Sequence, residues 1–241
     1  MNHSSLAIHH LHRRARAYAR EHGLVALVRT SFRTYVYERR PLYVYVCPHS
    51  LTTQDVPMPQ VEHFHAAFVA SNDEADELAR AHDDFRAIDG RARSGLEHGA
   101  VALVLYSGHR LANVSWLATN RVARRAIDAV DYPVDSSVHG AWTGRVRTMP
   151  RYEGKGLFLY ACARRFEYLL SLGIDVSATS IAPENVVSHA MAARLGCHLA
   201  GKGHAVRLLR WRWWRSGQLT LSDKEAVREA VATAFARRDG Q

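Results

Sequence analysis

The hydrophobic residues fall into short runs that alternate along the chain with segments of helical periodicity. Leu42 to Cys47 is rich in aromatic and β-branched residues, which predicts a strand that Pro48 ends. Further strands are predicted over residues 61–70, 99–106, 111–118, 134–147, 174–181 and 204–215. The segment 107–110 lies between two of these runs and predicts a β-hairpin.

Helices are predicted between these strands from capping residues and apolar spacing. Ser71 can cap a helix that runs to about Phe85, because Asp73 and Glu74 suit its first turn. Further helices are expected after Gly156, after Asn185 and over residues 224–237 behind Ser222 or Asp223, and 120–130 is a short helix or a structured loop. Residues 48–60 and 90–95 are expected to be a linker and a loop. The alternation predicts an α/β fold with a mixed sheet.

Residues 1–41 form a basic helical N-terminal extension in this interpretation, and residues 42–241 form one domain. Glu21 and Glu38 are the only acids in the arginine-rich extension. A basic amphipathic helix of this kind can lie on an anionic membrane surface through residues 1–40. The favoured alternative is that it packs on the domain's own sheet with its arginines in solvent.

The charge balance favours an anionic partner or a phosphate-rich cofactor. The 241 residues carry a net charge of +9 and 47% are hydrophobic, which is ample for a buried core. An arginine-rich composition alone would give the same balance. The tryptophans and arginines of residues 207–214 could stack on nucleic-acid bases, but an amphipathic strand is favoured. No apolar run is long enough to predict a transmembrane helix, and the N-terminus does not resemble a secretory signal.

The cysteines and histidines predict no disulfide framework and no metal site. Cys47, Cys162 and Cys197 are far apart and odd in number, and no Cys-x-x-Cys pair occurs. This pattern indicates a reducing cytosol. The only dense histidine group, at residues 9–12, lacks acidic or cysteine partners.

The most informative stretch is a glycine-bearing turn between a predicted strand and a predicted helix. Gly154 and Gly156 allow the backbone to approach a ligand closely, and Lys155 adds a positive charge. The free amides of a helix N-terminus bind phosphate. The spacing fits neither a Walker loop nor a dinucleotide fingerprint, and a simple tight turn is the alternative.

This stretch resembles the central motif of the GNAT superfamily of N-acetyltransferases. The matching residues are Thr148, Pro150, Tyr152, Gly154, Lys155, Gly156 and Leu157. The family's second motif is matched by Asn185 and Ser188 on a helix, followed by Leu195 and Gly196. The resemblance spans about residues 136–212 and implies a mixed, mostly antiparallel central sheet flanked by helices. Leu157 and Phe158 after the glycines resemble a subgroup associated with bacterial polysaccharide chemistry.

The resemblance implies acetyl-CoA, or another acyl-CoA, as co-substrate and no metal. The amides of Gly154–Phe158 would hold the pyrophosphate. A backbone amide near Thr148 would polarise the thioester carbonyl as negative charge develops on its oxygen. Asn185 and Ser188 would hold the pantetheine arm.

Four residues depart from the family pattern, and one of them is Cys197, which replaces the usual phenylalanine. Glu153 stands where arginine or glutamine is usual, and Phe158 stands where a small residue is usual. Ala192 replaces a tyrosine that protonates the leaving thiolate in many members. Glu153 either turns away from the phosphates and pairs with Arg147 or Arg151, or weakens the site.

Several side chains are candidates for proton transfer. His139 is the first candidate for the base because its pKa suits neutral pH, although a buried structural role is favoured for it, and Glu184 is the second. Ser188, His189 or water would protonate the thiolate.

The sequence therefore predicts a cytoplasmic acyl-CoA-dependent N-acyltransferase acting on the amine of a small molecule or amino sugar. A catalytically degenerate GNAT-fold binding or scaffold protein is the alternative, and a basic nucleic-acid-binding protein is a third. The acceptor, the acyl chain length and the oligomeric state are not specified by the sequence.

Overall fold

The computed structural model describes residues 37–128, 140–209 and 211–239, together with Gly23, Val25 and Tyr132. The predicted helical extension therefore lies outside the described residues, apart from Gly23, Val25 and its last five residues. Those five belong to the first strand rather than to a helix. His139 also lies outside the described residues.

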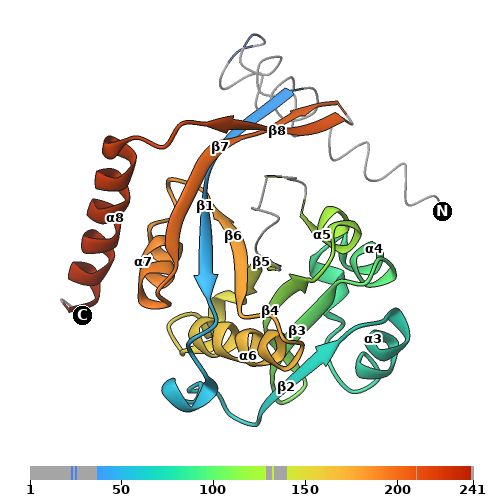
Figure 1. Ribbon diagram of the computed structural model, residues 1–241. Helices are drawn as coiled ribbons and strands as arrows, with labels where there is room; N and C mark the ends of the chain where they lie inside the picture. The colour runs from blue at the N-terminus through green and yellow to red at the C-terminus, as the bar shows by residue number, and fades with distance from the viewer. Residues whose placement is uncertain are drawn as a thin grey trace.

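The described strands form one eight-stranded sheet in the order β2-β3-β4-β5-β6-β1-β7-β8 (Figure 1). The strands are β1 (Tyr37–Pro48), β2 (Phe64–Val69), β3 (Val101–Ser107), β4 (Arg110–Ala118), β5 (Ala141–Thr148), β6 (Val176–Ile181), β7 (His198–Leu208) and β8 (Trp211–Gly217). All neighbours pair antiparallel except β5 and β6. The predicted mixed, mostly antiparallel sheet is confirmed.

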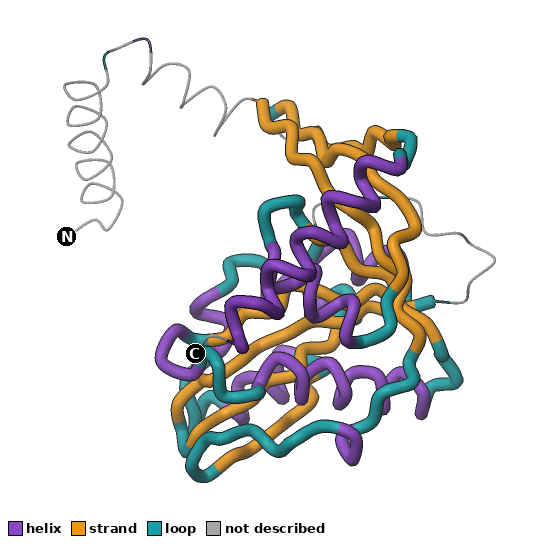
Figure 2. Tube along the Cα trace, turned by 90° about the vertical axis from the view of Figure 1, so that its left-hand side faces the viewer, coloured by secondary structure: helices purple, strands orange, loops and turns teal. Residues whose placement is uncertain are grey.

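Helices cover both faces of this sheet, and the ends of β1, β7 and β8 extend beyond them (Figures 1 and 2). The α-helices are α3 (Asn72–Leu78), α4 (Ala92–Glu97), α5 (Arg121–Ile127), α6 (Leu157–Ser171), α7 (Val186–Arg194) and α8 (Leu221–Asp239). Short 3-10 helices are η2 (Thr53–Asp55), η3 (Phe85–Ile88) and η4 (Pro150–Tyr152). None of the helices within the described residues could cross a membrane.

Side chains of the central strands point alternately to the two faces of the sheet, and each face has its own hydrophobic core. Val104 and Trp116 pack with Ile127 of α5 on one face, which we call the α4/α5 face. Leu103, the neighbour of Val104, packs with Phe166 of α6 on the other face, the α6/α7 face. Successive strand side chains point to opposite faces, so both cores follow from a period of two.

Two predicted boundaries on the α4/α5 face are wrong. The helix capped by Ser71 ends at Leu78 rather than Phe85. Phe85 instead begins η3, which Asp84 caps by accepting a hydrogen bond from the Arg86 amide. The predicted loop at 90–95 is occupied by the start of α4. A Cβ on Gly95 would lie 2.4 Å from a methyl carbon of Ile127, so this glycine permits close helix packing rather than a loop.

The C-terminal part also differs from its prediction. The single strand expected at 204–215 is a hairpin, because β7 and β8 pair antiparallel with Leu208 opposite Trp211. α8 is capped by Thr220, not by Ser222 or Asp223: the Thr220 hydroxyl accepts from the Asp223 amide, and Asp223 accepts from the Thr220 amide at 2.7 Å.

The cysteine prediction is wrong as well. Cys47 and Cys197 form a disulfide, whereas Cys162 is free and buried. Pairing of β1 with β7 places Val46 opposite His198, so the two cysteines become cross-strand neighbours despite their separation in sequence. The cysteines therefore give no support for a reducing cytosol.

The sheet splits between its two parallel strands. β5 and β6 pair only at Ala141 and Trp142, although β5 continues to Thr148. Beyond these pairs, Arg145 and Val146 both lie opposite the single residue Ser115 of β4, which is a β-bulge. A bulge bends its strand and increases the local twist, so β5 turns away from β6.

Arg145 holds the bulge in an unusual backbone conformation. Its φ is +47°, in the left-handed region that non-glycine residues rarely adopt. Its guanidinium donates to the Ile127 carbonyl at 2.6 Å and to Asp89 at 2.8 Å, which fixes the bulge to the α4/α5 face.

We predict that Arg145→Val destabilises the protein more than Arg145→Gly does. Both changes remove the guanidinium bonds, but only valine conflicts with the left-handed backbone. The difference should be about 1 kcal/mol in the free energy of unfolding in urea, after glycine's larger unfolded-state entropy is included. Equal destabilisation by the two variants would show that the bulge imposes no backbone constraint.

Candidate functional site

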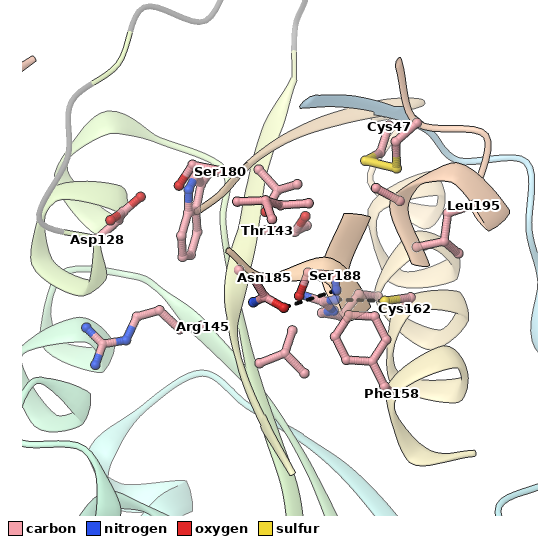
Figure 3. Close-up of a pocket in the computed structure, with 18 of the residues that line it drawn as sticks. Cys47, Asp128, Thr143, Arg145, Phe158, Cys162, Ser180, Asn185, Ser188 and Leu195 are labelled. Atoms are coloured by element: carbon pink, nitrogen blue, oxygen red, sulfur yellow. Dashed lines mark hydrogen bonds between the residues drawn. A yellow bond between two sulfur atoms is a disulfide. The ribbon is translucent and has the colours of Figure 1, made fainter. Parts of the chain in front are cut away.

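A cleft of about 610 Å³ passes through the split in the sheet. Its lining includes Trp142, Thr143, Gly144, Val146, Thr179, Ser180 and Ile181 from the two diverging strands. Figure 3 shows Asp128 and Arg145 on one side of β5, and Phe158 and Cys162 on the other. The cleft therefore joins the α4/α5 face to the α6/α7 face, and its volume is typical of small-molecule sites.

The glycine turn opens α6 beside this split, as the sequence predicts. Gly154 and Gly156 have φ values of +76° and +81°, which favour glycine. Leu157 is buried and anchors the helix, whereas Gly154, Lys155 and Gly156 are exposed. The Lys155 carbonyl accepts from the Gln60 amide at 3.0 Å and so fixes the turn to the segment before β2.

The turn has the donors that a phosphate needs. No side chain caps α6, and its first turn contains no acid. Among the described residues, no acceptor bonds the amides from Gly154 to Leu159. The space beside the turn is also open, since a Cβ on Gly154 would meet nothing within 4 Å. Free amides at the positive end of a helix dipole are suited to an anion such as pyrophosphate.

Glu153 does not form the ion pair that the sequence suggests. It is exposed, and within the described part of the chain it makes no salt bridge. Arg147 donates to the Ile88 carbonyl at 3.2 Å, and the Arg151 guanidinium lies 4.8 Å from the centre of the Tyr152 ring. Neither arginine is therefore paired with Glu153, and its carboxylate stands in solvent beside the turn.

Three other predicted cofactor residues lie along the split. The Thr148 hydroxyl accepts from the Asn113 side chain at 2.8 Å and ends β5. The Asn185 side-chain oxygen accepts from the Ser188 amide at 3.1 Å and caps α7. Asn185 and Ser188 line the cleft together with Phe158. Since its oxygen caps the helix, Asn185 retains its NH₂ group to donate into the cleft.

His189 is part of the core and does not line the cleft. It is fully buried, and its Nε2 donates to the Ala182 carbonyl at 3.1 Å. Its Nδ1 is then the acceptor for the Tyr45 hydroxyl at 2.8 Å. Burial lowers the pKa of His189 and, with a smaller effect of Tyr43, raises the pKa of Tyr45 to about 12. His189 therefore acts in packing, and its placement does not favour a role as proton donor.

The predicted bases are not seen at the cleft. Glu184 is exposed and is not a lining residue, and His139 lies outside the described residues. Asp128, at the end of α5, is the one carboxylate among the described lining residues. No cluster that could bind a metal ion is found in the described part of the chain.

The arginines of the cleft were not predicted from the sequence. Arg165 of α6 is 2% exposed and donates to the Ala161 and Trp116 carbonyls and to the Cys162 sulfur. Arg40, Arg91 and Arg145 line the side that faces α4 and α5. A charged residue on the apolar stripe of α6 is a signal that could have identified Arg165. The others come from distant segments and carry no local signal.

Comparisons with known proteins give remote structural likenesses. No protein-family model matches the chain, and no curated protein matches its sequence. Solved structures similar to it include a functionally unknown conserved protein from Staphylococcus epidermidis, at 13% identity and a TM-score of 0.45. Others are a GCN5-related N-acetyltransferase-like protein from Streptococcus suis (13%, 0.43) and a GCN5-related N-acetyltransferase from Sphaerobacter thermophilus (14%, 0.42).

The likenesses are partial in length as well. They cover 76%, 80% and 83% of this chain, respectively, and the chain spans 67%, 68% and 60% of those proteins.

We predict that stability falls as the pH is lowered from 7 to 5, and that His189→Gln reduces this fall. Burial holds the pKa of His189 below that of the unfolded chain, so the unfolded state binds the proton first. The stability that neutral His189 provides is present in full above pH 6.5. Below that pH the unfolding free energy falls by up to about 1.4 kcal/mol per pH unit. Glutamine can keep both hydrogen bonds without titrating. Parallel pH profiles of the unfolding free energy for variant and parent would contradict this.

Proposed function

We propose that the protein is an acyl-CoA-dependent N-acyltransferase that acts on a small-molecule amine. The observation that carries the proposal is the placement of unbonded helix amides, from Gly154 to Leu159, beside a split that opens a cleft through the sheet. An elongated cofactor whose phosphate binds at the turn would extend from there into the split.

The described residues suit such a cofactor along its length. The amides of the turn would hold the pyrophosphate, and Lys155 would add a mobile charge. The NH₂ group of Asn185 and the hydroxyl of Ser188 would bond the amide groups of the arm. The aromatic ring of Phe158 and the disulfide of Cys47 with Cys197 give this half of the cleft an apolar surface.

Bound acyl-CoA supplies a thioester whose C–S bond breaks as a new C–N bond to the acceptor forms. The acceptor ammonium must lose two protons, one before its nitrogen attacks and one as the amide forms. The departing thiolate gains one proton, and the other passes to solvent. Asp128 lies on the α4/α5 side of the cleft, where it could take a proton from an amine; His139 stays a prediction. Ser188 lies on the opposite side, where it could pass a proton to the sulfur.

A catalytically degenerate binding protein is the second candidate, and Glu153 and Ala192 favour it. Ala192 lines the cleft where a tyrosine donor would otherwise stand, and Glu153 leaves a carboxylate beside the phosphate position. Binding of acetyl-CoA is common to both candidates, and turnover separates them. Acetyl-CoA at about 100 times its Kd should stabilise the fold by about 2.7 kcal/mol in either case. Release of free thiol in the presence of an amine should occur only in the enzyme.

We predict that Glu153→Arg tightens acetyl-CoA binding by roughly three- to tenfold, and more at low salt. The change replaces an exposed like charge with an opposite one near the pyrophosphate, and exposed charges are screened by salt. Calorimetric titration at two ionic strengths measures the effect. Glu77→Arg, the same charge change on exposed α3, is the matched control and should leave the Kd unchanged. If parent and Glu153→Arg both fail to bind, the acyltransferase proposal falls.

A further inference from the structure

A second, smaller hollow adjoins the cleft on its α4/α5 side. It has a volume of about 210 Å³ and is lined by Glu38, Arg40, Arg91, Arg207 and Arg212, together with Ala205 and Val206. We call it the arginine hollow. Arg40 and Arg91 line both the hollow and the main cleft, so the two spaces are adjacent and share these side chains as a boundary.

We propose that the arginine hollow binds an oxyanion, a carboxylate or a phosphate, on the acceptor molecule. The hollow and its arginines support an oxyanion site by themselves. The assignment of that oxyanion to the acceptor rests on the proposed function. The acceptor class is then an amine that also carries a carboxylate or a phosphate, rather than a neutral or purely cationic amine.

Strand register gathers the arginines on one face of the sheet. Arg207 lies opposite Arg212 across β7 and β8, and opposite Glu38 across β1 and β7. Arg40 is two residues beyond Glu38 and therefore points to the same face. Across β1, β7 and β8, Arg40 lies opposite Ala205, and Ala205 lies opposite Trp214. Trp214 packs on the core of the α4/α5 face. This row identifies the face.

The carboxylates near the hollow do not neutralise it. Glu38 pairs with Arg207 at 3.1 Å, and Asp89 pairs with Arg145 at 2.8 Å. Within the described ranges, no carboxylate forms a salt bridge with Arg40, Arg91 or Arg212. Three guanidinium groups thus share one concave surface without an acidic partner.

The pKa of Arg91 reflects this excess of positive charge. Arg91 is half-buried at the start of α4, and its pKa is lowered by burial first and then by Arg212 and Arg145, against smaller opposing effects of Asp128 and Asp89. Like charges in a partly desolvated space repel one another, and a bound anion would remove that cost. Guanidinium groups match the geometry of carboxylate and phosphate oxygens through paired hydrogen bonds.

The position of the hollow fits an acceptor rather than the cofactor's phosphates. The free amides of α6 lie on the opposite face of the sheet, at the other side of the split. A molecule held by its oxyanion in the hollow can direct an amine through the shared Arg40 and Arg91 boundary into the cleft. A volume of about 210 Å³ suits an oxyanion with a few further atoms.

The test measures binding of inorganic phosphate and of succinate to the full chain saturated with CoA, so that the glycine turn is occupied. We expect saturable binding of at least one probe by calorimetry, weakened about tenfold or more in both Arg91→Gln and Arg212→Gln. Arg215→Gln is the matched control, because Arg215 is exposed on the same strand and is not part of the hollow. Whichever probe binds more tightly identifies the oxyanion.

A second readout separates binding from folding. In low-salt buffer without phosphate, Arg91→Gln should have a higher Tm than the parent, because a repelling charge is gone, and it should gain less Tm when phosphate is added. Equal anion affinity in the parent and both hollow variants, or no saturable binding by a folded protein, would overturn the proposal. If CoA fails to bind while phosphate binds in an Arg91-dependent way, the oxyanion site stands and the acyltransferase proposal falls.

Discussion

The β-bulge in β5 is the constraint on which the cleft depends. A continuous β5–β6 ladder would fill the sheet with backbone hydrogen bonds and leave no passage between its faces. Because Arg145 and Val146 oppose one residue of β4, the strand turns and pairing with β6 stops after Trp142. The guanidinium bonds of Arg145 to α5 and to Asp89 hold this geometry against the cost of a left-handed backbone.

The split gives the two faces of the sheet different chemistry. On the α6/α7 face, neutral amides at a helix end and an apolar wall suit a long cofactor with phosphates at one end. On the α4/α5 face, guanidinium groups and Asp128 suit a charged acceptor. In the proposed function, reactants that enter from opposite faces would meet in the strand gap, where rigid elements would orient both. This arrangement favours reaction through proximity and orientation.

Local signals in the sequence predicted the glycine turn and the starts of α6 and α7. Features that depend on contacts between distant segments could not be predicted. Gly154 and Gly156 and the capping residue Asn185 are local features, so the turn and both helix starts were predicted in place. The arginine hollow and the Cys47–Cys197 disulfide depend on the register of β1 against β7, which joins segments about 150 residues apart. The bulge at Arg145 was missed because no glycine marks its left-handed backbone.

Hydrogen exchange with and without acetyl-CoA tests the use of the split as a cofactor site most directly. The amides of Gly154–Leu159 have no acceptor among the described residues, so they should exchange rapidly in the free protein. On addition of acetyl-CoA these amides and those of β5 from Thr143 to Val146 should become protected together. Protection confined to other elements, or none at saturating acetyl-CoA, would contradict a cofactor that binds at the turn and enters the split.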